Sequence, residues 1–209
     1  MLLYYITDRT QFPGNECERR ERLLDKIAEA AGAGVDLIQL REKDLSSREL
    51  ESLALEALRR LRASGDSTRL LINSRADIAL AAGADGVHLR SKDITAEDVR
   101  KIWRDAGGPN IPVVAVSCHN DAEVIAAEDA GADFIVFGPV FEKKHSPETR
   151  STGLDDLKSA CQHKIPVLAI GGVTGHNAQL CIQAGAAGVA GIRLFQTGEI
   201  STQVAALRR

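Results

Sequence analysis

Polar and charged side chains follow several short apolar segments of the chain, and one such group suits the binding of a small anion. Gln39, Arg41 and Lys43 stand at alternate positions directly after an apolar segment. Alternate residues of an extended segment face the same side, so these three are expected to point into one site. Arg binds phosphate through two parallel hydrogen bonds and Lys as a point charge. The alternative is a solvent-exposed ion-pair cluster with Glu42 and Asp44.

Three other residues suggest metal or acid–base chemistry. Asp93 lies just past the apolar segment 86–89. It suits a Mg²⁺ ion shared with a diphosphate, because Mg²⁺ is usually held by one or two carboxylates and substrate phosphates; the alternative is a turn or N-cap aspartate. His119 is a candidate general acid or base near neutral pH, or a rim histidine that only forms hydrogen bonds. His88 lies within an apolar segment and is expected to be a hydrogen-bonded structural residue.

Glycines near the end of the chain suit the close approach of a phosphate. Gly171 and Gly172 follow the apolar segment 166–170 and precede an expected helix start. Backbone N–H groups at such a point bind phosphate, and the helix dipole favours its negative charge. The alternative is a tight turn without a ligand. Gly191 and Arg193 occupy the corresponding place after the next apolar segment.

The elements that position these residues are visible as a repeated pattern. Alanines, a glycine, one or two small residues and a short apolar segment recur four times: EAAGAGVDLIQL (29–40), LAAGADGVHL (80–89), EDAGADFIVFGPV (128–140) and IQAGAAGVAGI (182–192). The pattern predicts a helix that ends at a left-handed glycine, a tight turn and a buried strand. Apolar strands without alternation are typical of a sheet covered on both faces.

Helices are predicted between the strands. Residues 19–31 and 46–63 carry apolar side chains at helical spacing, and Ser46 or Ser47 with Glu49 resembles a capping box. Three more helices are expected to open at Thr95–Asp98, Asn120–Glu123 and Thr174–Asn177.

Eight strands are predicted, near residues 3–6, 35–40, 69–72, 86–89, 112–116, 133–137, 166–170 and 187–191. Eight such units without a break in composition predict an α/β protein with a single (β/α)8 TIM barrel over residues 1–209. The alternative is an open doubly wound sheet, which leaves the four similar helix-to-strand joints unexplained. In a barrel, the active site lies at the C-terminal ends of the strands, where all the polar residues above would meet.

Composition excludes several classes of protein. A net charge of −3 and 4% aromatic residues argue against nucleic acid or an anionic membrane surface as a partner. We expect neither a signal peptide nor a membrane-spanning segment in this sequence. Cysteines are scattered without a C-x-x-C pair, so we expect small core residues in a reducing, cytoplasmic compartment: Cys17, Cys118, Cys161 and Cys181. Assembly into a homo-oligomer is also compatible with this sequence.

Six blocks together resemble one family in the right order over nearly the whole chain. They are YYITDR, IQLREKD, LLINSRADIALAAGADGVHL, VSCH, GADFIVFGPVF and PVLAIGGVT…AGAAGVAGI. The resemblance is to the thiamin phosphate synthase family, which includes the TenI-type thiazole tautomerases. It implies a (β/α)8 barrel that joins hydroxymethylpyrimidine diphosphate to thiazole phosphate with Mg²⁺ and releases diphosphate. The implied partners are these two small phosphorylated molecules.

Residue by residue, the resemblance implies that Gln39, Arg41, Lys43 and Asn73 bind the pyrimidine diphosphate. It implies that Ser117 lies near the reacting centre.

The resemblance also implies a metal ligand and a phosphate loop. Asp93 matches one of two Mg²⁺ aspartates, and Gly171 and Gly172 match the loop that binds the thiazole phosphate. The family's second Mg²⁺ aspartate directly follows the position of Asn73, where this chain has Ser74. The site therefore lacks one negative charge and one strong ligand.

Two other segments differ from the synthase pattern. The loop after the sixth strand, residues 142–153, reads EKKHSPETRSTG in place of a Pro-Thr-x-Thr-Lys type, and Lys143 and Lys144 are expected to supply its charge. After the eighth strand the family often has Val-Ser, whereas this chain has Ile192 and Arg193. An arginine there is expected to bind a phosphate.

The tautomerase branch is the alternative function. It also lacks the acidic residue at position 74 and isomerises a thiazole carboxylate phosphate by proton transfer, without a cofactor; its acid–base histidine matches His119. The retained QLREKD segment and Asp93 favour the synthase. A non-catalytic barrel that binds a phosphorylated ligand is a third possibility, because fold alone does not fix function.

Overall fold

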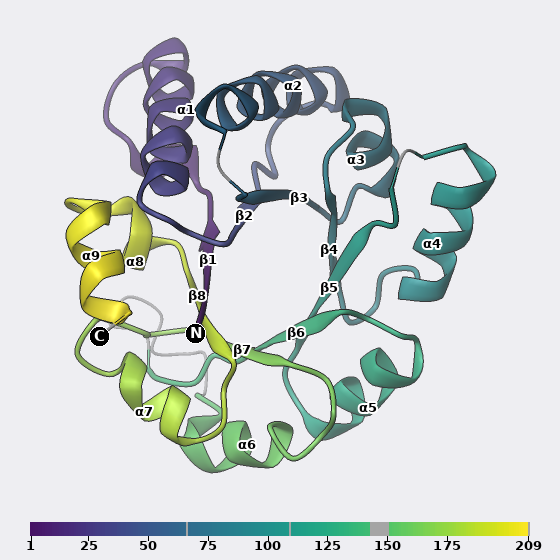
Figure 1. Cartoon of the computed structure of the whole chain (residues 1–209), viewed down its shortest axis with the longest axis vertical. Helices are drawn as coiled ribbons and strands as arrows, with labels where there is room; N and C mark the ends of the chain where they lie inside the picture. Colours follow the sequence, from purple (N-terminus) through teal and green to yellow (C-terminus); the bar gives the residue numbers. More distant parts are fainter. Residues whose placement is uncertain (66, 109, 143–150, 209) are drawn as a thin grey trace.

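The computed structural model describes residues 1–65, 67–108, 110–142 and 151–208. Its eight strands are parallel and close into a barrel in chain order (Figure 1). The strands are β1 (Leu2–Ile6), β2 (Leu37–Leu40), β3 (Arg69–Asn73), β4 (Gly86–Arg90), β5 (Val113–Cys118), β6 (Phe134–Phe137), β7 (Val167–Ala169) and β8 (Gly188–Gly191). Every predicted strand matches an observed one to within two residues at either end. The predicted (β/α)8 barrel is confirmed, and the open sheet is excluded because β8 pairs with β1.

Helices form an outer ring around the strands (Figure 1). They are η1 (Arg9–Gln11), α1 (Glu16–Gly32), α2 (Ser47–Ser64), α3 (Ala76–Ala82), α4 (Ala96–Asp105), α5 (Asp121–Asp129), α6 (Gly153–Ala160), α7 (Ala178–Gln183), α8 (Arg193–Gln196) and α9 (Ile200–Leu207). Within the described ranges, no helix is long and apolar enough to span a membrane.

The helix starts follow local capping chemistry. Ser46, rather than Ser47, caps α2 and forms a reciprocal capping box with Glu49. The expected helix start at Thr174 is wrong by one turn: the Thr174 N–H donates to Asn177 Oδ1 at 2.7 Å, which closes a turn before α7 begins at Ala178. The side chain at position 177 thus caps the turn instead of the helix.

The repeated joints have the predicted conformation. Their glycines, Gly34, Gly83, Gly131 and Gly185, all have positive φ. An aspartate in three of the four repeats has a second role that the pattern did not reveal. Asp36, Asp85 and Asp133 each accept a hydrogen bond, at 2.7–2.8 Å, from the backbone N–H of a residue on the preceding strand. These carboxylates tie consecutive strands together at the bottom of the barrel.

Two apolar layers hold the barrel together. One lies between the strands and the surrounding helices, and the other fills the barrel interior with side chains that include Tyr4, Phe134 and Leu168. Cys118 and Cys181 are buried as expected, but Cys17 is exposed because it lies in the solvent-facing first turn of α1. The interior packing leaves the upper end of the barrel as the place for a ligand.

Replacement of Asp85 by alanine is expected to lower the free energy of unfolding by about 1–3 kcal/mol, because the fully buried Leu70 loses the acceptor of its N–H. Denaturant unfolding measures this change. Asp105→Ala, at an exposed position of α4, is the control and should change stability little. Equal losses in the two variants would contradict the strand-tying role.

Candidate active site

A cavity of about 520 Å³ opens at the C-terminal ends of the strands. Residues from or just after all eight strands line it: Ile6, Gln39, Arg41, Lys43, Asn73, His88, Arg90, Ser91, Lys92, Asp93, Ser117, His119, Val136, Ile170 and Ile192. Eight of the residues singled out from the sequence meet here: Gln39, Arg41, Lys43, Asn73, His88, Asp93, Ser117 and His119. Sequence reasoning missed the apolar residues of the wall and the Arg90–Lys92 segment, although the inward parity of strand residues is a usable signal for the former.

The cavity carries excess positive charge. Arg41, Lys43, Arg90 and Lys92 line it, against the single carboxylate of Asp93. Among the described residues, the side chains of Arg41 and Lys43 have no hydrogen-bond or ion-pair partner. The charge of Arg41, then burial, then the charge of Arg90 lower the pKa of Lys43. Cations placed together without a counter-ion favour the binding of an anion.

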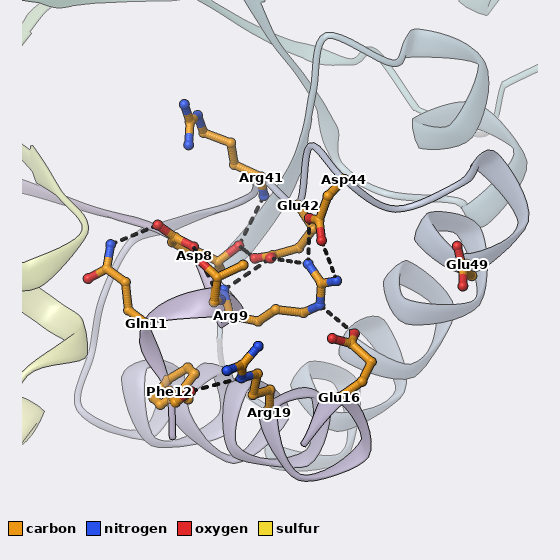
Figure 2. Close-up of polar contacts among 12 residues, drawn as sticks. Asp8, Arg9, Gln11, Phe12, Glu16, Arg19, Arg41, Glu42, Asp44 and Glu49 are labelled. Carbon is orange, nitrogen blue, oxygen red and sulfur yellow. Dashed lines mark hydrogen bonds and ion pairs between the residues drawn. The ribbon is translucent and has the colours of Figure 1, made fainter. Parts of the chain in front are cut away.

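The two acidic residues that alternate with Arg41 and Lys43 form their ion pairs outside the cavity. Glu42 and Asp44 both pair with Arg9, whose Nη1 lies 3.1 Å from Glu42 Oε2 and 2.7 Å from Asp44 Oδ1. Figure 2 shows this cluster with the guanidinium of Arg41 pointing away from it. Glu42 and Asp44 are thus directed to Arg9, whereas Arg41 and Lys43, in the same segment after β2, line the cavity. The alternative of an ion-pair cluster among residues 41–44 is therefore wrong.

Hydrogen bonds extend from this cluster to the backbone of Arg41. Glu42 accepts from Thr7 Oγ1 at 2.5 Å and from the Arg9 N–H at 3.0 Å, and the Arg41 N–H donates to Thr7 Oγ1 at 3.0 Å (Figure 2). The hydrogen bonds that Arg9 donates to Asp44, opposed by burial, raise the pKa of Arg9 overall. The β2–α2 segment is thus held in place without using the charges of Arg41 or Lys43.

Ser74 and Asp93 lie together at the edge of the cavity. The Ser74 hydroxyl donates to Asp93 Oδ2 at 2.7 Å, and Arg90 donates to the same carboxylate through its N–H and Nε. Burial raises the pKa of Asp93, but the hydrogen bonds from Arg90 and Ser74 outweigh it, so the pKa lies below its ordinary value. Asp93 is a turn aspartate as well as a cavity residue, and Thr95 is the N-cap of α4.

Ser74 has an unusual backbone conformation. Its φ is +56°, in the left-handed region that non-glycine residues rarely adopt. This conformation costs about 1–2 kcal/mol for a residue with a Cβ. It directs the side chain away from the barrel wall and toward Asp93. Aspartate and asparagine tolerate this conformation better than serine does.

Oxygen atoms of Asp93 and Ser74 are the candidate protein ligands for Mg²⁺. In the described part of the chain, no group of three or more His, Cys, Asp or Glu side chains forms a metal cage. Asp93 and Ser74 supply one ionised carboxylate and one hydroxyl oxygen that are 2.7 Å apart. Mg²⁺ is commonly bound by one or two carboxylates, with water and substrate phosphates completing its six ligands. The residues therefore fit an ion that is shared with a phosphorylated substrate.

The buried His88 and the half-buried Ser117 form a hydrogen-bonded pair on the cavity wall. His88 Nε2 lies 2.8 Å from Ser117 Oγ, and Nδ1 lies 2.9 Å from the hydroxyl of Tyr4. Burial, assisted by the charge of Arg41, lowers the pKa of His88 to about 3. The imidazole is therefore neutral near pH 7, and the expectation of a hydrogen-bonded structural histidine is confirmed.

His119 lies on the cavity rim with a defined ring orientation. Its Nδ1 lies 2.6 Å from the carbonyl oxygen of Gly138, and a carbonyl oxygen only accepts hydrogen bonds. The hydrogen of the neutral ring is therefore on Nδ1. In the described residues, Nε2 has no partner, so it is free to accept a proton. This geometry suits general acid–base chemistry.

Gly171 and Gly172 lie just beyond the cavity lining. Both have positive φ, and a Cβ on Gly171 would come within 2.4 Å of the Cβ of Pro139. The pair therefore forms a tight turn packed against the segment after β6, five residues or more before α7, so no helix dipole acts on it. Neither N–H donates a hydrogen bond within the described ranges, which leaves both available to a ligand.

The remaining candidate binding residues either lie apart from the cavity wall or fall outside the residues that the structure describes. Gly191 ends β8, and its neighbour Ile192, rather than Arg193, lines the cavity. The side chain of Arg193 is exposed. Lys143 and Lys144 lie outside the described residues.

Known proteins resemble this chain over nearly its whole length. A family model described as thiamine monophosphate synthase matches residues 3–195. The chain is 41% identical to the putative thiamine-phosphate synthase 2 of Aquifex aeolicus over 194 residues, 92% of this chain and 96% of that protein. It is 39% identical to the thiamine-phosphate synthase of Chlorobium limicola over 195 residues, 90% of this chain and 82% of that protein.

A solved structure shares both the fold and part of the sequence. The thiamine phosphate pyrophosphorylase of Pyrococcus furiosus superposes with a TM-score of 0.81 and 29% identity, covering 99% of this chain and 93% of that one. The resemblance seen in the sequence is thus confirmed over almost its full length, together with the expected enzyme class, a transferase of thiamin biosynthesis. The chain belongs to the thiamine monophosphate synthase family.

Proposed function

We propose that this chain joins hydroxymethylpyrimidine diphosphate to thiazole phosphate and releases diphosphate. The observation that carries the proposal is the pair of cations without counter-ions, Arg41 and Lys43, on a cavity that is otherwise lined in part by aliphatic side chains. A leaving diphosphate needs such charge, and Arg is suited to grip it through two hydrogen bonds. The 39–43% identity to relatives named as synthases supports the same reaction.

In the proposed reaction the bond between the pyrimidine methylene carbon and the diphosphate oxygen breaks, and its electron pair leaves with the diphosphate. The thiazole nitrogen then forms the new C–N bond with its lone pair. Arg41 and Lys43 stabilise the charge that develops on the diphosphate. Gln39 and Asn73 offer amides that orient the pyrimidine, and both line the cavity. Orientation of two bound reactants accounts for a large part of such catalysis.

Aliphatic residues protect the reactive carbon. Ile6, Val136, Ile170 and Ile192 line the same cavity as the cations. Water would capture a pyrimidine-stabilised cation, so its exclusion by these side chains favours capture by the thiazole. Ser117, which lines the same cavity, would contact the reacting centre.

Asp93 and Ser74 would hold Mg²⁺. The ion, when bound, neutralises negative charge on the diphosphate. Ser74 supplies a neutral oxygen, so the protein contributes one carboxylate in place of two. The N–H groups of Gly171 and Gly172, which donate no hydrogen bond within the described residues, would bind the phosphate of the thiazole, and Arg193 would add charge beside Gly191. The described residues contain no membrane-spanning helix, and we propose that the enzyme acts in the cytoplasm.

A second candidate is thiazole tautomerisation. The observation that favours it is His119, whose Nδ1–H is fixed on the Gly138 carbonyl so that Nε2 is free for proton transfer at the cavity. Serine at position 74 agrees with a metal-independent reaction, whereas the unpaired Arg41 and Lys43 favour the synthase.

Incubation of the purified protein with both synthase substrates and Mg²⁺ is expected to produce thiamin phosphate. EDTA should stop the reaction, and Asp93→Ala should slow it about a hundredfold by removing the only cavity carboxylate in the described structure. Arg75→Ala, outside this cavity, is the control for general damage to the rim. If EDTA and Asp93→Ala both leave the rate of thiamin phosphate formation unchanged, the metal-dependent proposal is wrong.

Ser74→Asp is expected to lower the Mg²⁺ concentration for half-maximal activity by about tenfold, because it adds a second carboxylate at a backbone position that aspartate tolerates. Magnesium titration of the initial rate measures the shift. Ser91→Asp places the same charge elsewhere on the cavity lining and should shift the midpoint less. Equal shifts would show that the effect is general electrostatics.

His119→Ala separates the two candidate reactions. If the chain is a synthase, this variant should retain most of its coupling rate. If it is a tautomerase, aromatisation of the thiazole carboxylate phosphate should fall about a hundredfold. NMR of the thiazole product measures the second reaction without Mg²⁺. Unchanged aromatisation in the variant would exclude His119 as its acid–base group.

A further inference from the structure

We propose that Tyr4 and His88 are positioning residues that orient the hydroxyl of Ser117. In this arrangement Tyr4 holds His88 in the tautomer with hydrogen on Nε2, and His88 in turn directs the Ser117 hydroxyl proton into the cavity, toward an electron-rich atom of the bound pyrimidine diphosphate. The part that concerns the substrate rests on the proposed synthase function; the part that concerns the tautomer does not.

The three side chains come from three different strands and form one continuous chain of hydrogen bonds. Tyr4 lies on β1, His88 on β4 and Ser117 on β5. The Tyr4 hydroxyl is 2.9 Å from His88 Nδ1, and His88 Nε2 is 2.8 Å from Ser117 Oγ. Tyr4 has no exposed surface and His88 has 3%. The connection therefore runs from the dry interior of the barrel to the cavity.

Packing fixes the imidazole ring between its partners. The rings of Tyr4 and His88 are stacked, with centroids 5.6 Å apart and an angle of 20° between their planes. Phe134 meets Tyr4 edge-on at 5.7 Å from the opposite wall of the barrel. Rotation of His88 would break both its hydrogen bonds and this stack, so the ring has one orientation.

The Tyr4 hydroxyl decides which nitrogen of His88 carries the hydrogen. Within the described residues, that hydroxyl has His88 as its one hydrogen-bond partner. If Nδ1 carried the hydrogen, the Tyr4 oxygen would accept it, and the tyrosine proton would be buried without an acceptor. If Nδ1 is bare, the tyrosine donates and every group is satisfied. The penalty for an unpaired buried donor favours the Nε2–H tautomer by about tenfold or more.

This tautomer sets the role of Ser117. His88 donates its Nε2–H to Ser117 Oγ, so the serine accepts on that side and its own proton must point elsewhere. The arrangement is the reverse of a serine nucleophile, which donates to the histidine that activates it. Burial and the charge of Arg41 lower the pKa of His88 to about 3, which also makes it a poor proton acceptor near neutral pH. Ser117 is therefore a hydrogen-bond donor to the ligand.

The tautomer can be measured directly, without any substrate. Long-range proton–nitrogen NMR distinguishes the bare from the protonated nitrogen of each of the five histidines; the His88 signals are assigned as those lost in His88→Gln. We expect a bare Nδ1 and a protonated Nε2 in the wild type, and a shift toward the other tautomer in Tyr4→Phe. A protonated Nδ1 in the wild type would overturn the proposal.

Kinetics tests the effect on Ser117. Tyr4→Phe is expected to lower kcat for thiamin phosphate formation about tenfold and to change KM less than about twofold. The matched control is Tyr5→Phe: Tyr5 is equally buried on the same strand, but its hydroxyl donates to Gln196 on the other side of the sheet. Equal kcat losses in the two variants would reduce the effect to packing and overturn the proposal.

Further variants test the proposal even if Tyr4→Phe also lowers the stability of the protein. His88→Gln retains an amide donor near the position of Nε2 and should retain more activity than His88→Leu, at equal thermal stability. Adding Tyr4→Phe to Ser117→Ala should cause no further loss of kcat, because the relay acts through that hydroxyl. If Tyr4→Phe lowers kcat as much in the Ser117→Ala background as in the wild type, the proposal is overturned. Failure of the wild type to form thiamin phosphate would refute the proposed function alone, since the tautomer is read in the free protein.

Discussion

The buried ion pair between Arg9 and Glu42 is the interaction on which the cavity depends. Their side chains are 4% and 1% exposed. Burial of two charges is unfavourable unless hydrogen bonds satisfy their remaining groups. Here the carboxylate of Glu42 accepts from Thr7 Oγ1, from the Arg9 N–H and from the Arg9 guanidinium, while Asp44 binds the guanidinium from the exposed side. The pair is therefore fully hydrogen-bonded where it is least accessible.

This pair separates two sets of charges that are mixed in the sequence. Residues 41–44 follow β2 and alternate between basic and acidic; the acids pair with Arg9, and the bases line the cavity. Arg41 and Lys43 consequently reach the cavity without neutralisation. Their mutual repulsion, visible in the lowered pKa of Lys43, is tolerated because the backbone of the segment is anchored through Thr7. A bound anion would relieve it.

Ser74, which directly follows β3, carries a second constraint at the edge of the cavity. This residue is strained at a position where the side chain contacts Asp93. Strain of this kind is concentrated at functional sites, where surrounding structure holds it in place. Here the Ser74 N–H donates to the carbonyl of His88 at 2.8 Å, which ties the strained residue to β4, the strand that carries His88. Ser74, His88 and Ser117 are thus linked through β4.

Much of this protein follows from its sequence alone. Apolar segments of four to six residues, joint glycines and capping residues such as Ser46 act over short distances, so they predict the eight strands, the barrel and the edge at which polar residues gather. The alternation from Gln39 to Lys43 likewise predicts which side chains face the cavity, although β2 itself ends at Leu40.

Only the tertiary structure decides which partners those residues choose. Arg9 is 33 positions from Glu42, and Tyr4 is 84 positions from His88, so neither pairing has a local signal. The same holds for the turn at Gly171, whose close packing on Pro139 is set by a neighbouring strand, and for the exposure of Arg193. Local patterns determine where a chain turns and what it buries, whereas the charge state and hydrogen-bond role of each site residue are fixed by neighbours that barrel closure brings together.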